Sequence, residues 1–135
     1  MRTLLRNLAI LATICTGISA HAQSVTTPPA ELCLPPFYKK HMNVNGIHIC
    51  SSDKVPDSCF HAARITFDAL TRMLPSHVME SLTKRGARVT IMAKDEMTTD
   101  VPEHAYLARD KKTDWDKRAR GLGGTLWLPL SSCAE

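Results

Sequence analysis

The sequence lacks the short motifs that identify a catalytic site on their own. It has no H-E-x-x-H zinc motif, no G-x-S-x-G nucleophile turn, no G-x-x-x-x-G-K-[ST] phosphate loop and no EF-hand pattern. No two of its five cysteines have the C-x2-C spacing of a structural zinc site. These absences leave organisation, charge and loop chemistry as the features that bear on function.

Long apolar runs are also missing, except for one near the N-terminus. Arg2 and Arg6 precede an apolar stretch over residues 8–18, and small residues follow it. This stretch is shorter than the ~20 residues that span a bilayer. The layout is typical of a secretory signal peptide over residues 1–22. We therefore expect a secreted or periplasmic protein that leaves the membrane after signal cleavage.

Removal of the signal lowers a positive charge that is already small. The chain has 135 residues and a net charge of +4, and the loss of two arginines leaves +2. Such a balance argues against nucleic acid and anionic membranes as partners. The remaining length suits one small domain with a modest core. No feature of the sequence indicates an oligomeric state.

Cysteine usage agrees with export. An even number of cysteines remains after signal removal, and in a small exported domain this favours disulfides over metal binding. Cys50 and Cys59 flank a short loop between an expected strand and an expected helix, and we predict that they are bonded. Cys133 lies near the end of the chain, and its partner stays open. The four remaining cysteines are Cys33, Cys50, Cys59 and Cys133.

The rest of the chain predicts a leader and one domain. Residues 23–36 are rich in Ser, Thr and Pro and predict an extended, loosely held leader. Residues 37–135 predict a single small domain. Near its start, Asn45 and Gly46 lie between alternating apolar positions and predict a β-hairpin, because a type I′ turn needs positive φ at both residues.

Periodicity after the hairpin predicts helices on one side of a sheet. Apolar residues recur at helical spacing in one long segment, and a shorter helical segment follows it. The expected elements are helices over 55–74 and 77–85, a buried strand over 87–93 and a last apolar strand over 125–130. This order predicts an α+β (or α/β) domain, a small mixed sheet with a β-hairpin and two helices.

Carboxylates gather in the loop after the expected strand. The segment "KDEMTTDVPEH" contains Glu96, Asp100, Glu103 and His104. Carboxylates and imidazole are the groups that metal sites and general acid–base sites use. However, Pro102 prevents one regular helix, so these groups do not share a face. We therefore favour solvated loop residues over a site.

Three segments carry a resemblance to a known group. "DEMTTDVPEH", "WDKRARGLGGT" and "SSCAE" together resemble the N-terminal part of exported, uncharacterised bacterial proteins with a zincin-like (lethal-factor-type) metallopeptidase domain. The resemblance covers residues 37–135 and implies a fold similar to the upper lobe of a zincin. It further implies that an apolar strand binds an extended peptide or protein substrate, and that the loop acids lie around a zinc site as outer-shell groups. The implied substrate strand contains Thr125, Leu126, Trp127 and Leu128.

The zinc motif of that group is missing from this sequence. No catalytic residue and no metal ligand can therefore be assigned, and zinc is expected only in a completed family member. The first hypothesis is the N-terminal lobe of a secreted zinc metallopeptidase-like hydrolase, inactive alone because the chain stops before its catalytic helix. The alternative is a small, disulfide-stabilised secreted or periplasmic binding module without catalysis.

Overall fold

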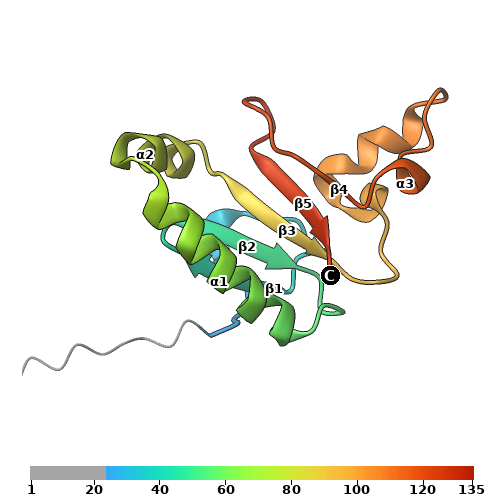
Figure 1. Ribbon diagram of the computed structural model, residues 1–135. Coiled ribbons are helices and arrows are strands. Elements are labelled where there is room, and N and C mark those ends of the chain that lie inside the picture. The colour runs from blue at the N-terminus through green and yellow to red at the C-terminus, as the bar shows by residue number, and fades with distance from the viewer. Residues whose placement is uncertain (1–23) are drawn as a thin grey trace, which may run out of the picture.

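A computed structural model describes residues 24–135 as a mixed α+β domain, which confirms the expected fold class. The predicted signal peptide lies outside the described residues. Five strands form one sheet in the order β1-β2-β3-β5-β4 (Figure 1). The strands are β1 (Lys40–Val44), β2 (Ile47–Ser51), β3 (Arg88–Met92), β4 (Gly121–Leu122) and β5 (Leu130–Ala134). The helices are α1 (Asp57–Met73), α2 (Ser76–Lys84) and α3 (Trp115–Arg118), with 3-10 helices η1 (Ala30–Leu32), η2 (Thr98–Asp100) and η3 (Pro102–Arg109).

The inner strands of the sheet are parallel and its edge strands are antiparallel. β2, β3 and β5 run in the same direction, while β1 pairs antiparallel with β2 and β4 pairs antiparallel with β5. The crossover from β2 to β3 contains α1 and α2, as a parallel connection requires. No helix of the described part of the chain has the length and apolar character needed to cross a bilayer.

The hairpin turn forms where the sequence predicts it. Asn45 and Gly46 both have positive φ, at 51° and 90°, as a type I′ turn needs. The Asn45 side chain donates hydrogen bonds to Asp68 Oδ1 and Thr71 Oγ1 on α1, both at 2.9 Å. A Cβ at Gly46 would lie 2.6 Å from Thr83 Cγ2 of α2. The turn is therefore packed against both helices.

Apolar packing joins the two helices to one face of the sheet. Phe60 of α1 is fully buried, and Phe67 of α1 and Leu82 of α2 pack against the same cluster of sheet residues. Pro75 separates the helices, and Gly86, with φ of 68°, follows the second one. Both predicted helices and the predicted strand after them are confirmed. The core cluster of this helix face includes Met42, Val44, Ile47, Ile49, Val89 and Ile91.

The segment over residues 93–109 covers the opposite face of the sheet. Val101, just before η3, packs with Met92 of β3 and Leu130 of β5 in a second, smaller cluster. The expected absence of one regular helix is confirmed here, because the segment forms two short 3-10 helices. Pro102 occupies the first position of η3, where its missing N–H breaks no hydrogen bond.

The leader is extended only in part, because η1 interrupts it at Ala30–Leu32, and it is not loosely held. Thr26 and His41 of β1 exchange both backbone hydrogen bonds, at 2.9 and 2.8 Å. Val25 packs against the helix-face core. The expectation that ordered structure starts near Phe37 is therefore wrong, because this segment covers the outer edge of β1.

The last strand begins five residues later than the sequence indicates. Residues 125–129 form a turn in which the Thr125 N–H donates to the Leu128 carbonyl at 2.8 Å. The Leu128 N–H donates in turn to the Thr125 hydroxyl at 3.0 Å. These two bonds close the chain on itself, so the predicted strand over 125–130 is wrong. The pairing with β3 starts at Leu130.

Candidate functional site

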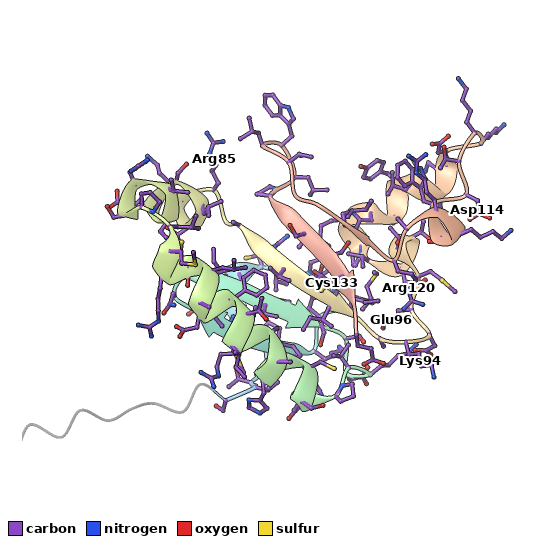
Figure 2. All side chains as sticks on the ribbon, viewed as in Figure 1. Arg85, Lys94, Glu96, Asp114, Arg120 and Cys133 are labelled. Carbon is purple, nitrogen blue, oxygen red and sulfur yellow. The ribbon has the colours of Figure 1, made fainter. Side chains whose placement is uncertain are left out.

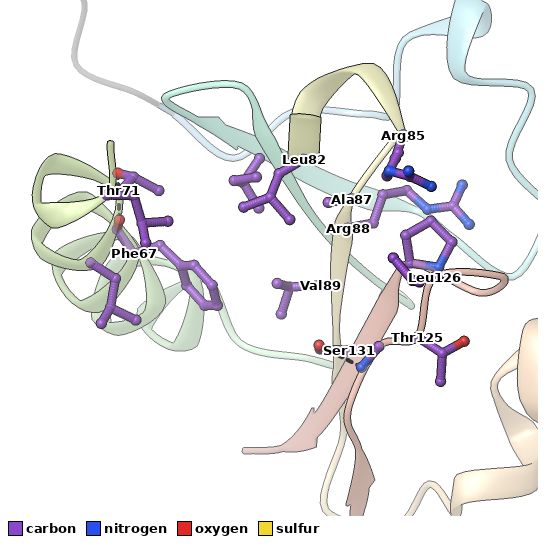
Figure 3. Close-up of a pocket in the computed structure, with 15 residues that line it drawn as sticks. Phe67, Thr71, Leu82, Arg85, Ala87, Arg88, Val89, Thr125, Leu126 and Ser131 are labelled. Atoms are coloured by element: carbon purple, nitrogen blue, oxygen red, sulfur yellow. Dashed lines mark hydrogen bonds between the residues drawn. The ribbon is translucent and has the colours of Figure 1, made fainter. Parts of the chain in front are cut away.

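An open groove lies on the helix face, where the helices leave β3 and β5 partly uncovered. Its volume is about 710 Å³, within the usual range for ligand pockets. Val89 of β3 and Ser131 of β5 line it between the two sides. Phe67 of α1 and Leu82 of α2 form one side (Figure 3). Most of the surface that this groove offers is therefore carbon.

The loop over residues 124–129 forms the other side of the groove. Leu126 and Pro129 line it, and Gly124 is held to the sheet because its N–H donates to Ser131 Oγ at 3.0 Å. Next to them, the side chain of Trp127 is 95% exposed. Exposed apolar residues beside an apolar groove are typical of a surface that another molecule covers.

The charges around the groove are of one sign. Arg85 and Arg88 line it, and among residues 24–135 no carboxylate does. Arg88 pairs with Glu103 at 2.7 Å, whereas Arg85 makes no ion pair within residues 24–135. Figure 2 shows Arg85 at the end of α2, on the side of the 124–129 loop. The groove thus combines apolar walls with an unpaired guanidinium.

Two of the acids singled out in the sequence close turns after β3. Glu96 is buried, and its Oε2 accepts the Ala93 N–H at 2.8 Å. Asp100 Oδ2 accepts the Met97 N–H at 2.8 Å. Both carboxylates satisfy backbone donors that the irregular chain leaves free. The role that these contacts give the two acids is therefore to stabilise their own loop.

Glu103 belongs to a hydrogen-bonded cluster under the sheet. Its Oε2 accepts a hydrogen bond from the Tyr38 hydroxyl at 2.6 Å, and its Oε1 accepts one from Arg88 Nη2 at 2.7 Å. Because Tyr38 donates to Glu103, the Thr90 hydroxyl donates to the Tyr38 oxygen at 3.1 Å. Burial, and then the bond to Glu103, raise the pKa of Tyr38 well above its usual value. The cluster thus keeps a neutral phenol beside a carboxylate and a guanidinium.

His104 is 2% exposed and faces Ser132 of β5. The distance from its Nε2 to Ser132 Oγ is 3.2 Å, and Ser132 Oγ also accepts the Leu122 N–H at 3.0 Å. Nδ1 of His104 has no partner within the described structure. Burial lowers the pKa of His104, so the imidazole is neutral at pH 7. The pair lacks a third group that would orient the imidazole for catalysis.

The four candidate residues of the loop after β3 do not come together in one site. Residues 24–135 contain no group of three or more His, Cys, Asp or Glu side chains arranged to hold a metal ion. Sequence reasoning missed a different pair, His41 and His48, whose Nε2 and Nδ1 atoms lie 2.9 Å apart across the hairpin. Burial lowers the pKa of both, aided by the charge of His48 on His41 and by that of Arg88 on His48.

The cysteines of the described chain are all free thiols. Ile47 and Ile49 of β2 belong to the helix-face core, so the alternation of a strand places Cys50 on the opposite face. Cys59 lies on α1 and packs against the helix-face core. The expected Cys50–Cys59 bond is not formed, and it would have to join two sides of the sheet.

Comparison with family models, with curated proteins and with solved structures finds no match for this chain. The apolar loop of the groove has a signal in the sequence, since Leu126 to Leu128 are consecutive large apolar residues beside a proline. That signal predicts a strand, because nothing in the neighbouring sequence shows that Thr125 closes a turn.

Proposed function

We propose that this domain binds an extended, apolar peptide that carries a carboxylate, and that the groove beside the 124–129 loop is its binding site. The observation that carries this proposal is the combination of carbon-lined walls with Arg85, a guanidinium without an ion pair in the described structure. Apolar walls favour any apolar ligand, whereas a guanidinium selects a ligand with an anionic oxygen pair.

Each part of the groove has a role in this proposal. The walls from Phe67, Leu82 and Pro129 bury apolar side chains of the peptide, which stabilises the complex by about 25 cal/mol for each Å² removed from water. Arg85 forms charge-assisted hydrogen bonds with the carboxylate. Trp127, which is almost fully exposed, closes over the bound segment.

A peptide-binding role fits the first hypothesis from the sequence, a lobe of a zincin-like metallopeptidase. Its specific support is β4, a short antiparallel strand at the edge of the sheet, which leads within two residues into the 124–129 loop of the groove. Such an edge can add an extended substrate as a further strand. In this setting a longer reading frame supplies the H-E-x-x-H segment, and the domain is inactive alone.

The second candidate is a binding module without catalysis. The groove itself supports it, because its apolar walls and Arg85 can hold a peptide without any further segment. In this setting the peptide belongs to a protein partner and leaves unchanged. The downstream coding sequence separates the two settings. An in-frame H-E-x-x-H with stoichiometric zinc and peptidase activity supports the lobe, and a stop codon supports the module.

The binding test uses a Leu/Val hexapeptide with a free C-terminal carboxylate and its amidated form, titrated by calorimetry. We expect the acid form to bind at least ~10-fold more tightly, as a charge-assisted pair of about 1.5–3 kcal/mol implies. Arg85→Gln should remove this preference. Lys84→Gln, which changes the same charge one residue earlier on α2, should keep it.

Two results would contradict the peptide proposal. Equal binding of the acid and amide forms, or equal effects of Arg85→Gln and Lys84→Gln, would mean that Arg85 selects no carboxylate. Dodecanoate serves as a competitor, because it offers the same anionic head on an acyl chain. Tighter binding of dodecanoate than of the peptide would identify the groove as a lipid site instead.

A further inference from the structure

The alternation of the strands decides which cysteines share a face of the sheet. Val89 and Ile91 of β3 belong to the helix-face core, and Ile91 lies directly opposite Cys133 of β5. In-register residues of neighbouring strands point to the same side. Cys133 is therefore on the helix face, near the end of the last strand (Figure 2).

Cys59 reaches the same place from α1. It lies in the first turn of the helix and packs against the helix-face core. Its Sγ donates to Glu135 Oε2 at 3.7 Å, and Glu135 follows Cys133 by two positions on the same side of the chain. Burial raises the pKa of Cys133, and the neighbouring Cys59 thiol raises it further. Cys59 and Cys133 are thus two free thiols on the same side of the sheet, outside bonding distance of each other, with Glu135 beside Cys59.

The other two cysteines of the described chain are separated from this place. Cys50 is buried on the opposite face of the sheet, where burial raises its pKa to about 12 and keeps it a thiol. Cys33 follows η1 outside the sheet and is exposed. Within residues 24–135, only Cys59 and Cys133 share one face.

We propose that Cys59 and Cys133 form a disulfide bond when the protein meets a low-molecular-weight disulfide. One of the two thiolates attacks a sulfur of the oxidant, which forms a mixed disulfide and releases one small thiolate. The second cysteine thiolate then attacks the protein sulfur of the mixed disulfide and releases the other small thiolate. Two electrons pass to the oxidant, and the two protons of the cysteine thiols go to its thiolates.

The bond would tie the first turn of α1 to the end of β5. It requires Cys59 to leave Glu135 and the first turn of α1 to move toward the end of β5, and it closes the loop over residues 59–133. Closing a long loop restricts the unfolded chain and so stabilises the folded one. The bond would also hold β5, part of the groove lining, against the helix that forms the facing wall.

The experiment uses the full chain with Cys15→Ser and Cys33→Ser, so that three cysteines remain and three pairings compete. The reduced protein is oxidised with glutathione disulfide, trapped with N-ethylmaleimide, and mapped as non-reduced peptides by mass spectrometry. We expect one bond, between the peptides that contain Cys59 and Cys133. Oxidation should raise the melting temperature by about 10 °C.

Single variants in that background sharpen the result. Cys50→Ala should keep both the bond and the thermal shift, whereas Cys59→Ser and Cys133→Ser should lose both. Dominant pairing of Cys50 with either partner would overturn the proposal. It would equally be overturned if bonding appeared only in urea, where the folded geometry no longer selects the pair.

Discussion

The two faces of the sheet are closed by different chemistry. On the helix face, α1 and α2 bury an apolar stripe around Phe60. On the opposite face, η3 in the segment over residues 93–109 brings Glu103 and His104 against Tyr38 and Ser132. The helix face is stabilised by burial of carbon, which no single contact controls. The polar face depends on a few specific hydrogen bonds.

This difference explains why acids gather in the segment after β3. Turns and the first turns of 3-10 helices leave backbone donors unpaired, and side-chain oxygens satisfy them. Glu96 and Asp100 do this for their own loop. Carboxylates that gather in a buried irregular segment therefore indicate local structure as readily as they indicate a site.

The largest effect should come from breaking the helix face. Phe60→Ala removes a fully buried ring and should lower the free energy of unfolding by about 3–5 kcal/mol, because the surrounding core cannot close the cavity. Urea denaturation followed by circular dichroism measures the change. Ile65→Ala on the exposed side of α1 is the matched control, with an expected change within ~0.5 kcal/mol. Equal effects would show that α1 does not pack as described.

A smaller effect is expected on the polar face. Glu103→Gln weakens the acceptor shared by Tyr38 and Arg88 and should lower the free energy of unfolding by about 1–3 kcal/mol. Glu80→Gln, on the exposed side of α2, tests the charge change without the contacts. A Glu103→Gln protein as stable as the wild type would mean that the cluster contributes nothing to closing this face.

The smallest effect is expected in the pH dependence of stability, to which the polar face contributes through His104. Burial lowers the pKa of His104 below its usual 6.5, so the unfolded state binds the proton more tightly. Above pH 6.5 the buried neutral His104 costs no stability. Below pH 6.5 the unfolded state takes up the proton first, and the free energy of unfolding falls by at most about 1.4 kcal/mol per pH unit. His104→Gln should flatten the fall in stability between pH 7 and pH 5. The exposed His77→Gln should leave it unchanged, and the opposite order would contradict the burial of His104.

Local signals in the sequence predict the helix face well. Asn45-Gly46 specifies its own turn, and the spacing of apolar residues specifies α1, because both depend on neighbours in the chain. β5 is different. Its residues, "LSSCA", have little intrinsic strand preference, and pairing with β3 decides their conformation. The apolar residues just before them, which look like the strand, instead close a turn through Thr125.

The candidate site was less predictable, for the same reason. Glu103 and Tyr38 are far apart in the sequence, and so are His104 and Ser132, so no local pattern shows that they are buried partners. The groove depends on where two helices stop short of β5, which is a property of packing alone. By contrast, the face of the sheet on which Cys50 lies can be predicted from the sequence, because Ile47 and Ile49 mark the core side of its strand.

The two hydrogen bonds from Asn45 to α1 affect how the domain opens locally. Because this side chain joins Asp68 and Thr71 to the hairpin turn, the hairpin cannot open without releasing the end of α1. We therefore expect the amide protons of both segments to exchange with solvent deuterium in one cooperative opening. Asn45→Gly keeps the turn conformation but removes the link, and should let the end of α1 exchange before the hairpin does.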